Sequence, residues 1–520
     1  EMEHNSVLRP LYELEEKGIG VTIVFCEKNG TISCEKIKQA IGKNTKAIVC
    51  THASNVTGDG NDIAQIGALC EKYNLYFILD ASQTAGAAGI DMEQDHISAI
   101  CFTGHKGLFG PQGTGGIALA DGVCVKPLLS GGSGVHSFER KHPMELPAAL
   151  EAGTLNGHGI AGLHAALDWI KKTGIAAIHE KEMALAEQFQ RGIETIPGIH
   201  LYGGEKRVAA IVSCNLADLD SAYVSDCLAE DYGIATRAGV HCAPLMHTHF
   251  GTEKQGMVRF SFSCFNTTEE VEKAVRAMQD IAAENRGKVT AYVGAGGKTS
   301  SIRKRAETLR AEGKRVLILT TTKMMVPQEQ EIFTAYEQTG QESVISATAS
   351  VWQERRAAEK QLKERVQSVL DTYGCCVAGS LIPGTEKFGM LPEKLMEDLL
   401  YLADEILIEA DGSAHMPVKA PAEHEPVLFP YMDEVVIVMG AHAIGKPLRE
   451  VCHRVDYAKE LLKCDADKIV TAADLKTPAE QGYAIPIQKQ YPWMKISKVT
   501  GKDIKLCLTA EKKDKVRDKQ

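Results

Sequence analysis

An acid and a lysine follow two successive apolar runs in the first part of the chain. Asp80 and Gln83 belong to the run Ile-Leu-Asp-Ala-Ser-Gln, and Lys106 ends the run Thr-Gly-His-Lys. A lysine can hold an aldehyde as an imine, and a carboxylate can keep a pyridine nitrogen protonated, so that the ring accepts electrons from a substrate's α-carbon. Each run alone is common in helix caps and loops, but in this order the two predict a site for pyridoxal phosphate (PLP).

The elements that must position these groups alternate between short strands and helices. We expect strands at Gly20–Phe25, Ala47–Cys50, Tyr76–Leu79, Ala99–Phe102 and Gly116–Leu119, and helices at Cys34–Ile41 and Ile63–Tyr73. This alternation predicts a largely parallel sheet covered on both faces. Asp80 and Lys106 would then stand just past strand ends, at the carboxyl edge where reactive groups collect.

Two long helices, Ile160–Thr173 and Ala177–Ile193, lead from this region to a smaller α/β lobe. The last helix of that lobe begins at a Thr-Thr-Glu-Glu cap that starts at Thr267, with acids in its first turn. A short polar stretch at 284–288 follows. We therefore place a first domain at 1–285, with its small lobe at about 200–285.

Strands and helices alternate again after this boundary. We expect strands at Val289–Val293, Arg315–Leu319, Ile406–Ile408 and Val435–Met439, and helices at Thr299–Ala311, Val351–Tyr373 and Glu393–Ala403. The pattern predicts a second, doubly wound α/β domain at 286–520. Its tail at 511–520 alternates charges almost without apolar partners and is expected to be solvated.

The motifs between His4 and about residue 283 resemble those of class V aminotransferase-fold enzymes, specifically cysteine desulfurases and selenocysteine lyases. The resemblance implies a PLP fold-type-I large domain, present in part, a small α/β domain and a homodimer. It makes Lys106 the Schiff-base lysine, Asp80 the partner of the ring nitrogen and Gln83 a ligand of the phenolic oxygen. The family's small-Gly-Thr-Thr/Ser segment is expected upstream of residue 1, so we interpret the chain as truncated at its start.

Further cofactor contacts are implied by the same resemblance. His4 matches the histidine that stacks on the PLP ring, and Asn55, in His-Ala-Ser-Asn, lies where the family approaches the phenolic oxygen. Thr103 and His105 match ligands of the cofactor phosphate. Thr154, in Glu-Ala-Gly-Thr, matches a threonine that reaches a phosphate across the dimer interface.

The loop Arg-Ala-Gly-Val-His-Cys-Ala, which contains Cys242, distinguishes desulfurases from plain transaminases. It resembles the loop of the Suf-type desulfurases and selenocysteine lyases. The resemblance implies that the Cys242 thiolate attacks the sulfur or selenium of cysteine or selenocysteine, which leaves a persulfide or selenide and alanine. Arg259 matches the arginine that binds the substrate carboxylate. A free cysteine can also be a small buried hydrophobe, which is the alternative for Cys242.

A glycine-rich run with a lysine and a threonine follows the first strand of the second domain. Gly294, Gly296 and Gly297 would let backbone N–H groups wrap a phosphate, Lys298 adds charge, and the Thr299 hydroxyl could hold Mg²⁺ of a bound nucleotide. The run is not a full Walker A motif, because Tyr292 occupies the first glycine position. The alternative is a tight turn in which Thr299 caps the helix.

Two acids, Glu409 and Asp411, end a later strand and are predicted to face the same nucleotide. The segments 294–299, 314–323, 408–414 and 419–426 resemble the putative selenium-dependent hydroxylase accessory proteins, over about 289–456. This resemblance implies a pathway, the maturation of selenium-dependent molybdenum hydroxylases, rather than a reaction. Nothing in the sequence selects ATP or GTP.

Composition limits the partners and the compartment. The chain has 520 residues, 44% of them hydrophobic and 24% charged, which indicates a globular protein with more than one core. A net charge of -10 argues against nucleic acid as a partner, and no apolar run is long enough to span a membrane. The 15 cysteines are scattered without metal-site spacing, so we predict no metal site and a cytoplasmic location.

The leading hypothesis is a PLP-dependent cysteine desulfurase or selenocysteine lyase fused to a nucleotide-binding accessory domain. Its substrate would be cysteine or selenocysteine, and its partner a sulfur or selenium acceptor protein or a molybdenum hydroxylase. One alternative keeps PLP without persulfide chemistry, as an aminotransferase or β-lyase. The other is a non-catalytic PLP-fold scaffold that carries a nucleotide-dependent chaperone domain.

Overall fold

The computed structural model of the chain describes residues 1–336 and 349–501. It divides into two compact units, residues 1–281 (unit 1) and 282–520 (unit 2). The expected charged tail at 511–520 lies outside the described residues. None of the described helices is both long enough and apolar enough to cross a bilayer.

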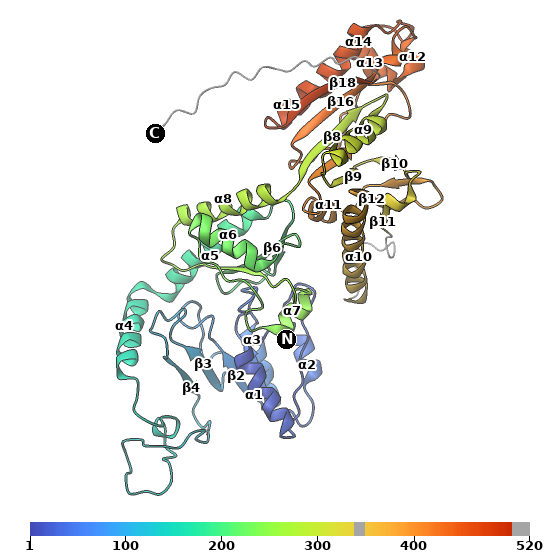
Figure 1. The fold of residues 1–520 in the computed structure, drawn as a ribbon. Coiled ribbons are helices and arrows are strands. Elements are labelled where there is room, and N and C mark those ends of the chain that lie inside the picture. Colours follow the sequence, from blue (N-terminus) through green and yellow to red (C-terminus); the bar gives the residue numbers. More distant parts are fainter. Residues whose placement is uncertain (337–348, 502–520) are drawn as a thin grey trace. The chain divides into compact units, whose positions relative to one another are not determined.

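The larger lobe of unit 1 is built on a four-stranded sheet in the order β1-β2-β3-β4 (Figure 1). β1 (Ala47–Thr51), β2 (Tyr76–Asp80) and β3 (Ala99–Thr103) are parallel, and β4 (Gly115–Leu119) is antiparallel to β3. The predicted strands at these positions are therefore confirmed, with one antiparallel edge strand. β2 occupies an interior position in the sheet, which places its last residue between the ends of two neighbours.

Alternating burial along β2 explains why this segment forms a strand against a helix. Phe77 and Leu79 are fully buried and pack in one core with Ile66 of α3 (Ile63–Tyr73). α2 (Cys34–Ala40) contributes Ile37 to the same core. Burial of each such side chain contributes roughly 1.5–3 kcal/mol.

The strand predicted at Gly20–Phe25 does not form. Its backbone is used by the first residue instead: the Glu1 amino group donates to the Val24 carbonyl at 3.0 Å, and the Glu1 carboxylate accepts the Cys26 N–H. The segment follows α1 (Asn5–Glu16) and lies outside the described sheet.

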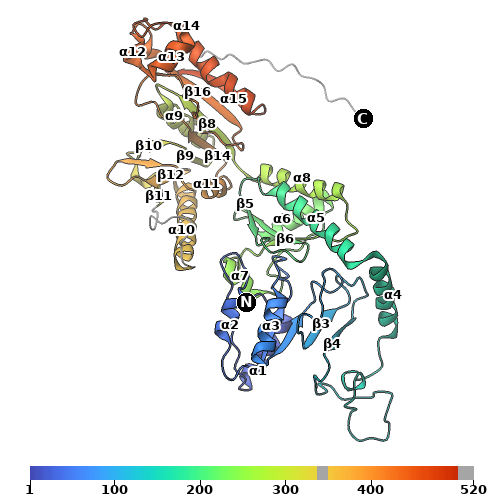
Figure 2. The same ribbon diagram turned by 180° about the vertical axis from the view of Figure 1, so that it is seen from behind.

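The small lobe has a three-stranded antiparallel sheet of β5 (Ile199–Tyr202), β6 (Ile211–Leu216) and β7 (Val258–Ser261). α5, α6 and α8 lie together on one face of this sheet in both views (Figures 1 and 2). The helices and the short 3-10 turn of this part of unit 1 are α4 (Gly157–Thr173), α5 (Ile175–Ile193), α6 (Ser221–Tyr232), α7 (Pro244–Phe250), α8 (Thr268–Asn285) and η1 (Ala148–Leu150).

Two local interactions explain the packing of this lobe. The predicted cap of α8 is present: the Thr267 hydroxyl accepts the Glu270 N–H at 3.3 Å, and the Glu270 carboxylate accepts the Thr267 N–H at 3.1 Å. On α5, the ring of Phe189 packs against Phe260 of β7 with centroids 4.3 Å apart. This fixes α5 against the sheet.

Unit 2 contains a nine-stranded sheet in the order β10-β13-β12-β9-β14-β8-β16-β18, with β11 beside β12. The neighbours from β12 to β18 are parallel, and β13 pairs antiparallel with both β12 and β10. Its strands are β8 (Lys288–Gly294), β9 (Val316–Thr320), β10 (Lys323–Met325), β11 (Phe333–Tyr336), β12 (Cys375–Leu381), β13 (Lys387–Gly389), β14 (Glu405–Glu409), β16 (Glu434–Gly440) and β18 (Lys495–Gly501).

Helices cover both faces of this sheet, as the doubly wound pattern predicts. Val289, Ala291 and Val293 of β8 belong to one core, and Tyr292 between them belongs to the other. α9 (Lys298–Ala311) packs on the Tyr292 side. The other elements of unit 2 are α10 (Ala349–Tyr373), α11 (Glu393–Leu399), α12 (Leu448–Val451), α13 (Val455–Leu462), α14 (Ala472–Thr477), α15 (Ile485–Gln490), the π-helical turn η4 (Pro478–Ala484), the 3-10 turns η2 (Gln330–Ile332) and η3 (Ala441–Ala443), and the strand pair β15 (Val418–Lys419) and β17 (Cys452–His453).

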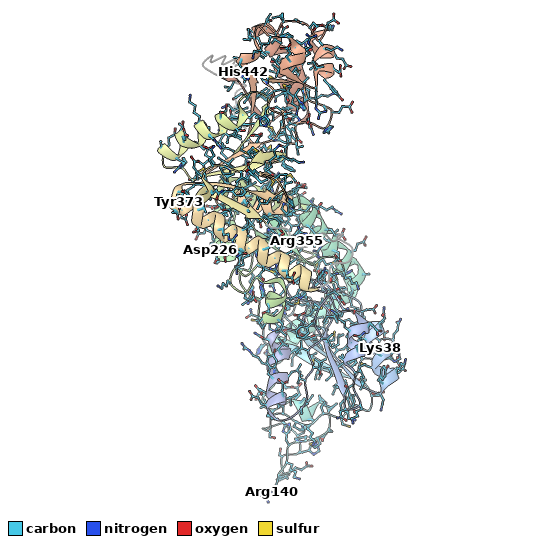
Figure 3. The ribbon with its side chains drawn as sticks, turned by 90° about the vertical axis from the view of Figure 1, so that its right-hand side faces the viewer. Lys38, Arg140, Asp226, Arg355, Tyr373 and His442 are labelled. Carbon is cyan, nitrogen blue, oxygen red and sulfur yellow. The ribbon has the colours of Figure 1, made fainter. Side chains whose placement is uncertain are left out.

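The long helix α10 can be followed in Figure 3, where Arg355 lies near its start and Tyr373 is its last residue. Arg355 pairs with Glu359 one turn further along at 3.0 Å. Leu362, Val366 and Leu370 of α10 are buried in the core on the Val289 face. Their spacing of four residues gives this helix its apolar stripe.

Candidate functional site

A cavity of about 400 Å³ in unit 1 is lined by half of the residues predicted for the PLP site. Five predicted residues line it: His4, Asn55, Gln83, Lys106 and Arg259. They come from segments as far apart in sequence as α1 and β7. The lining also contains five polar residues to which sequence reasoning gave no role: Glu182, Arg237, His241, Ser261 and Ser263.

Asp80 ends β2, where its backbone pairs with Thr51 and Cys101 of the neighbouring strands. One oxygen of its buried carboxyl group, Oδ1, accepts both the N–H of Ser82, at 2.9 Å, and the hydroxyl of Ser82. Among the described residues no donor engages Oδ2. The carboxyl group is thus held in place by Ser82, and Asp80 is not among the residues that line the cavity.

Lys106 follows β3, and protein atoms crowd its amine although part of the side chain is exposed. Burial lowers the pKa of Lys106, and the charges of Arg259 and Arg237 lower it further, against the opposing charge of Asp80. A lowered pKa increases the fraction of neutral amine, which is the nucleophilic form.

His4 caps the N-terminus of α1. Its Nδ1 accepts the Ser6 N–H at 3.0 Å, which fixes the orientation of the ring. Burial lowers the pKa of His4, and the charge of Lys106 lowers it further, so the imidazole is neutral near pH 7. A neutral, oriented ring suits stacking on an aromatic ligand.

Three buried polar atoms at the cavity have no hydrogen-bond partner among the described residues: Asn55 Oδ1, His241 Nδ1 and Arg259 Nε. The other polar atoms of the same side chains are engaged: Asn55 Nδ2 donates to the His241 carbonyl at 2.7 Å, and Arg259 Nη1 donates to the Asn55 carbonyl at 2.9 Å. Buried polar groups are normally paired. The unpaired atoms fit a polar ligand such as PLP with an amino-acid substrate.

Two arginines stand side by side at this cavity because their backbones pair. The Arg259 N–H donates to the Arg237 carbonyl at 2.9 Å, and the Arg237 N–H donates to the Arg259 carbonyl at 3.2 Å. Across the cavity, burial raises the pKa of Glu182, whose Oε1 accepts the Cys264 N–H at 3.0 Å. The signal for Arg237 was available, since it is the first residue of the loop that contains Cys242.

Cys242 is exposed, next to the cavity-lining His241. Both residues have left-handed backbone, with φ of 57° and 51° respectively. The Cys242 carbonyl accepts the N–H of Asn5 at 2.8 Å, which ties the loop to the start of α1. The alternative of a buried hydrophobe therefore does not apply to Cys242.

Thr103, His105 and Thr154 are not part of the cavity lining. The Thr103 hydroxyl and His105 Nδ1 lie 2.8 Å apart, so these two side chains contact each other. Thr154 is exposed in the irregular segment before α4. Asp80 and Cys242 are not in the lining either, and the roles of all the predicted site residues stay predictions.

In unit 2, the glycine-rich run forms a tight loop between β8 and α9. Gly294, Gly296 and Gly297 have positive φ of 91°, 74° and 123°. A Cβ on Gly294 would lie 2.2 Å from the Val438 carbonyl oxygen, so no larger residue fits there. A Cβ on Gly297 would meet nothing within 4 Å, which leaves open space above the loop.

Lys298 and Thr299 begin α9 directly after these glycines. Lys298 Nζ donates to the Gly294 carbonyl at 2.7 Å and lies 3.4 Å from the Ser413 hydroxyl. The Thr299 hydroxyl donates to Glu409 Oε2 at 2.9 Å. Burial raises the pKa of Glu409 and lowers that of Lys298. A hydroxyl and a strand-end carboxylate so placed are the ligand types that Mg²⁺ prefers.

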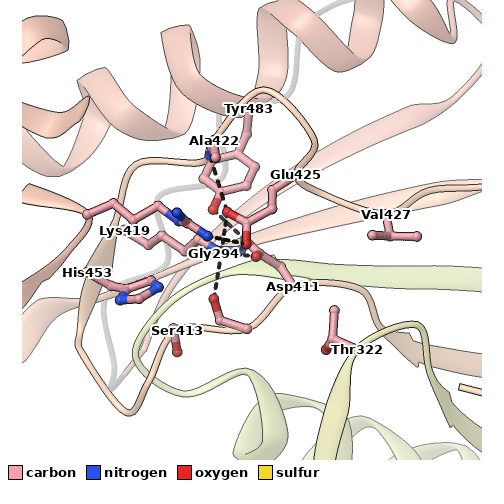
Figure 4. Close-up of polar contacts among 12 residues, drawn as sticks. Gly294, Thr322, Asp411, Ser413, Lys419, Ala422, Glu425, Val427, His453 and Tyr483 are labelled. Carbon is pink, nitrogen blue, oxygen red and sulfur yellow. Dashed lines mark hydrogen bonds and ion pairs between the residues drawn. The ribbon is translucent and has the colours of Figure 1, made fainter. Parts of the chain in front are cut away.

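Asp411 differs from Glu409 in having no oxygen to offer a ligand (Figure 4). Its side chain is fully buried; Oδ1 pairs with Lys419 Nζ, and Oδ2 accepts the Gly294 N–H at 3.2 Å and the Tyr483 hydroxyl. Protein donors thus engage both oxygens of Asp411, and its predicted contact with the nucleotide stays a prediction. Sequence reasoning missed Tyr483, which lies beyond the segments that carried the resemblance.

Comparison with known proteins agrees with the geometry of unit 1. A family model described as aminotransferase class V matches residues 1–274, and one described as YqeC protein matches residues 290–456. The probable cysteine desulfurase of Methanothermobacter thermautotrophicus is 32% identical over 286 residues, which cover 54% of this chain and 72% of that protein.

Solved structures show the same relationship for the fold. The apo cysteine desulfurase from Thermococcus onnurineus NA1 aligns with a TM-score of 0.51 at 29% identity, over 54% of this chain and 71% of that one. The cysteine desulfurase CsdA (S-sulfonic acid) from Escherichia coli aligns with a TM-score of 0.51 at 27% identity, over 54% and 70%. The cavity of unit 1 thus lies in a cysteine desulfurase-like fold, and the chain belongs to the class V aminotransferase family.

Proposed function

We propose that residues 1–285 form a PLP-dependent enzyme that takes sulfur from cysteine or selenium from selenocysteine. The observation that carries this proposal is the cavity at which Lys106, His4 and Arg259 meet, beside the exposed Cys242 and within reach of the charge of Asp80. A plain transaminase has no use for a cysteine at this place.

Each of these residues would make a different contact with PLP. Lys106, with its lowered pKa, would hold the aldehyde carbon, and Asp80 would keep a proton on the pyridine nitrogen. His4 would stack on the ring, and Asn55 and Gln83 would contact the phenolic oxygen. When bound, PLP supplies a ring that accepts electrons from the substrate's α-carbon.

The substrate carboxylate would be bound by Arg259, whose Nε is buried and without a protein partner among the described residues. A planar guanidinium matches a carboxylate with two parallel hydrogen bonds. Cys242 would then accept the substrate's sulfur or selenium as its thiolate, and alanine would leave.

Thr103, His105 and a second copy's Thr154 would bind the cofactor phosphate. Support for the homodimer comes from large apolar side chains that are exposed before and within α4, including Leu128, Phe138, Met144, Leu155 and Ile160. Several large apolar side chains exposed within one segment are candidates for burial against a partner. A cytoplasmic location is supported by the cysteines, since those in the described residues are free thiols.

Residues 286–520 would bind a nucleotide with Mg²⁺. Support comes from the glycine loop with open space above Gly297, from Lys298 at the start of α9, and from Thr299 opposite Glu409. Backbone N–H groups at such a helix start favour phosphate. The role proposed for the whole chain is chalcogen supply during maturation of selenium-dependent molybdenum hydroxylases, supported by the presence of both units in one protein.

The desulfurase proposal is tested by measuring alanine release from cysteine and from selenocysteine. Cys242→Ser should stop turnover with cysteine, whereas Cys124→Ser, which changes another exposed cysteine, should not. Unchanged alanine release by Cys242→Ser would refute the persulfide step, and transfer of the amino group to a keto acid would favour an aminotransferase.

The accessory role is tested separately. Equilibrium dialysis with ATP and with GTP in Mg²⁺ should show binding that Lys298→Ala weakens, and absence of both would exclude the nucleotide site. Isotope-labelled sulfur or selenium from the substrate should pass from Cys242 to a purified molybdenum hydroxylase. Retention of all label on the enzyme would rule out that acceptor.

A further inference from the structure

A buried group of charged and polar side chains lies directly against the glycine loop and has no role in the chemistry proposed above (Figure 4). Its members are Asp411, Lys419, Glu425, Arg454 and Tyr483. Asp411 and Lys419 have no exposed surface, and Tyr483 has none either. Burial of charged groups is costly unless they are paired, so the arrangement of this group is informative.

Asp411 is the centre of the group and connects it to the loop. Its Oδ2 accepts the Gly294 N–H at 3.2 Å. The carbonyl of the same glycine accepts Lys298 Nζ at 2.7 Å. Gly294 is therefore held by two hydrogen bonds. Its N–H donates to Asp411, and its carbonyl accepts from Lys298.

Lys419 supplies the positive charge that compensates Asp411. Its Nζ pairs with the Asp411 carboxylate, donates to the Gly412 carbonyl at 2.6 Å and lies 2.9 Å from Glu425 Oε2. Glu425 in turn pairs with Arg454 at 3.1 Å. Charges of alternating sign thus run from the loop to the partly exposed Arg454, and each buried charge has a partner.

Tyr483 completes the shell of donors around Asp411 from a distant part of the chain. It belongs to the π-helical turn η4, and its hydroxyl donates to Asp411 Oδ2 across 72 residues of sequence. Single π-helical turns occur often where a side chain serves a specific site. Burial raises the pKa of Tyr483, so the hydroxyl keeps its proton and acts as a donor at neutral pH.

We propose that Asp411 and Tyr483 are positioning residues that hold the glycine loop in the conformation that receives the phosphates of a nucleoside diphosphate or triphosphate. Tyr483 orients the Asp411 carboxylate, the carboxylate fixes the N–H of Gly294, and the loop then presents its remaining N–H groups to the ligand. The ligand part rests on the nucleotide-binding function proposed above. The part that concerns the loop conformation does not.

Tyr483→Phe in the full chain removes one hydroxyl from this arrangement. Asp411→Ala would leave Lys419 buried beside an incomplete set of partners and could prevent folding, so it is not the variant of choice. Tyr431→Phe is the matched control. Tyr431 is also buried in the core of unit 2, and its buried hydroxyl has no partner among the described residues.

Hydrogen exchange, followed by mass spectrometry, reads out the loop directly. We expect Tyr483→Phe to accelerate amide exchange in residues 292–299 by roughly 10-fold, as loss of a hydrogen bond to a charged group allows. Exchange in β12 should stay as in the parent chain, and Tyr431→Phe should change neither. Unchanged exchange in the loop would overturn the proposal, and so would equal acceleration in the loop and in β12, which would indicate a general loss of stability.

Binding of ADP and GDP with Mg²⁺, compared with adenosine and guanosine, tests the ligand part. Tyr483→Phe should weaken diphosphate binding by roughly 10-fold and leave nucleoside binding unchanged, because only the phosphates contact the loop. Full diphosphate affinity in the variant would overturn the ligand part. If the parent chain binds neither diphosphate, the proposed function fails, and the exchange experiment still decides the role of Tyr483.

Discussion

The two candidate sites differ in how their own polar groups are satisfied. At the cavity of unit 1, buried atoms of Asn55, His241 and Arg259 lack a partner among the described residues. In unit 2, Lys298 bonds to the loop itself and Asp411 is surrounded by protein donors. An unpaired buried polar group costs about 1–3 kcal/mol. The first site is therefore arranged for completion by a ligand, whereas the second is held together by the protein.

This difference has a consequence for mutations. Removing a polar side chain from the first site should remove activity and leave stability nearly unchanged. Removing one from the second should destabilise unit 2.

Lys106→Ala should reduce alanine release from cysteine by more than about 1,000-fold, because no other cavity amine can take its place. The measurement is steady-state turnover at saturating cysteine and PLP. The thermal unfolding temperature of the same variant should match that of the parent chain, because Lys106 is an exposed residue. Lys171→Ala, on the exposed face of α4, is the control and should keep full activity.

Lys419→Met should destabilise unit 2 by about 3–5 kcal/mol, because it leaves the buried carboxylate of Asp411 without its cation. Urea unfolding monitored by a signal from unit 2 measures this loss. Lys288→Met breaks an ion pair with Glu434 whose lysine is 44% exposed, and should cost no more than about 1 kcal/mol. Equal losses of unfolding free energy in the two variants would show that the buried pair of Asp411 and Lys419 is no more important for stability than an exposed ion pair.

Acid should weaken unit 1 through its buried imidazoles. Burial lowers the pKa of His52 to about 4, below the value of about 6.5 in an unfolded chain. Between these values the unfolded state binds more protons, so stability rises with pH and falls as pH drops from 6.5 toward 4. Between pH 7 and pH 5, the free energy of unfolding measured in urea should fall by about 1–2 kcal/mol less in His52→Gln than in the parent chain.

The exposed His164 of α4 gives the matched control for this experiment. His164→Gln should leave the pH dependence of unfolding as it is in the parent chain. The account of the buried imidazole would be wrong if the two variants changed the pH dependence by the same amount.

Asn55→Ala should change the stability of the cofactor-free chain by at most about 1 kcal/mol, because it removes one hydrogen bond and one unpaired oxygen together. Asn61→Ala makes the same exchange, since its Nδ2 donates to Thr51 and its Oδ1 is also unpaired among the described residues. Asn61 does not line the cavity. PLP titration should therefore show weaker binding for Asn55→Ala alone. Equal PLP affinities of the two variants would show that Asn55 does not contact the cofactor.

The sequence predicted the regular parts of both units better than the contacts between distant segments. β1, β2 and α3 lie where periodicity placed them, because local apolar patterns determine them. The strand expected at Gly20–Phe25 does not form, and within this segment the Val24 carbonyl accepts a hydrogen bond from Glu1 instead. β18 was not predicted, because lysines interrupt its apolar residues and only pairing with β16 defines it.

The same limit applies to the sites. Lys106, His4 and Arg259 were predicted because each belongs to a recognisable run, and the cavity brings them together. The role proposed for Asp411 depends on Tyr483, which is 72 residues away and belongs to no motif. A contact of this kind has no signature in the sequence, so only the structure could distinguish Asp411 from Glu409.

The central claim is that the unit 1 cavity binds PLP through Lys106. Reduction of the PLP-loaded full-length protein with borohydride, followed by peptide mass spectrometry, tests it directly. We predict a single stable pyridoxyl adduct on Lys106, and none in Lys106→Ala. An adduct on a different lysine, or the absence of any adduct after saturation with PLP, would contradict the account.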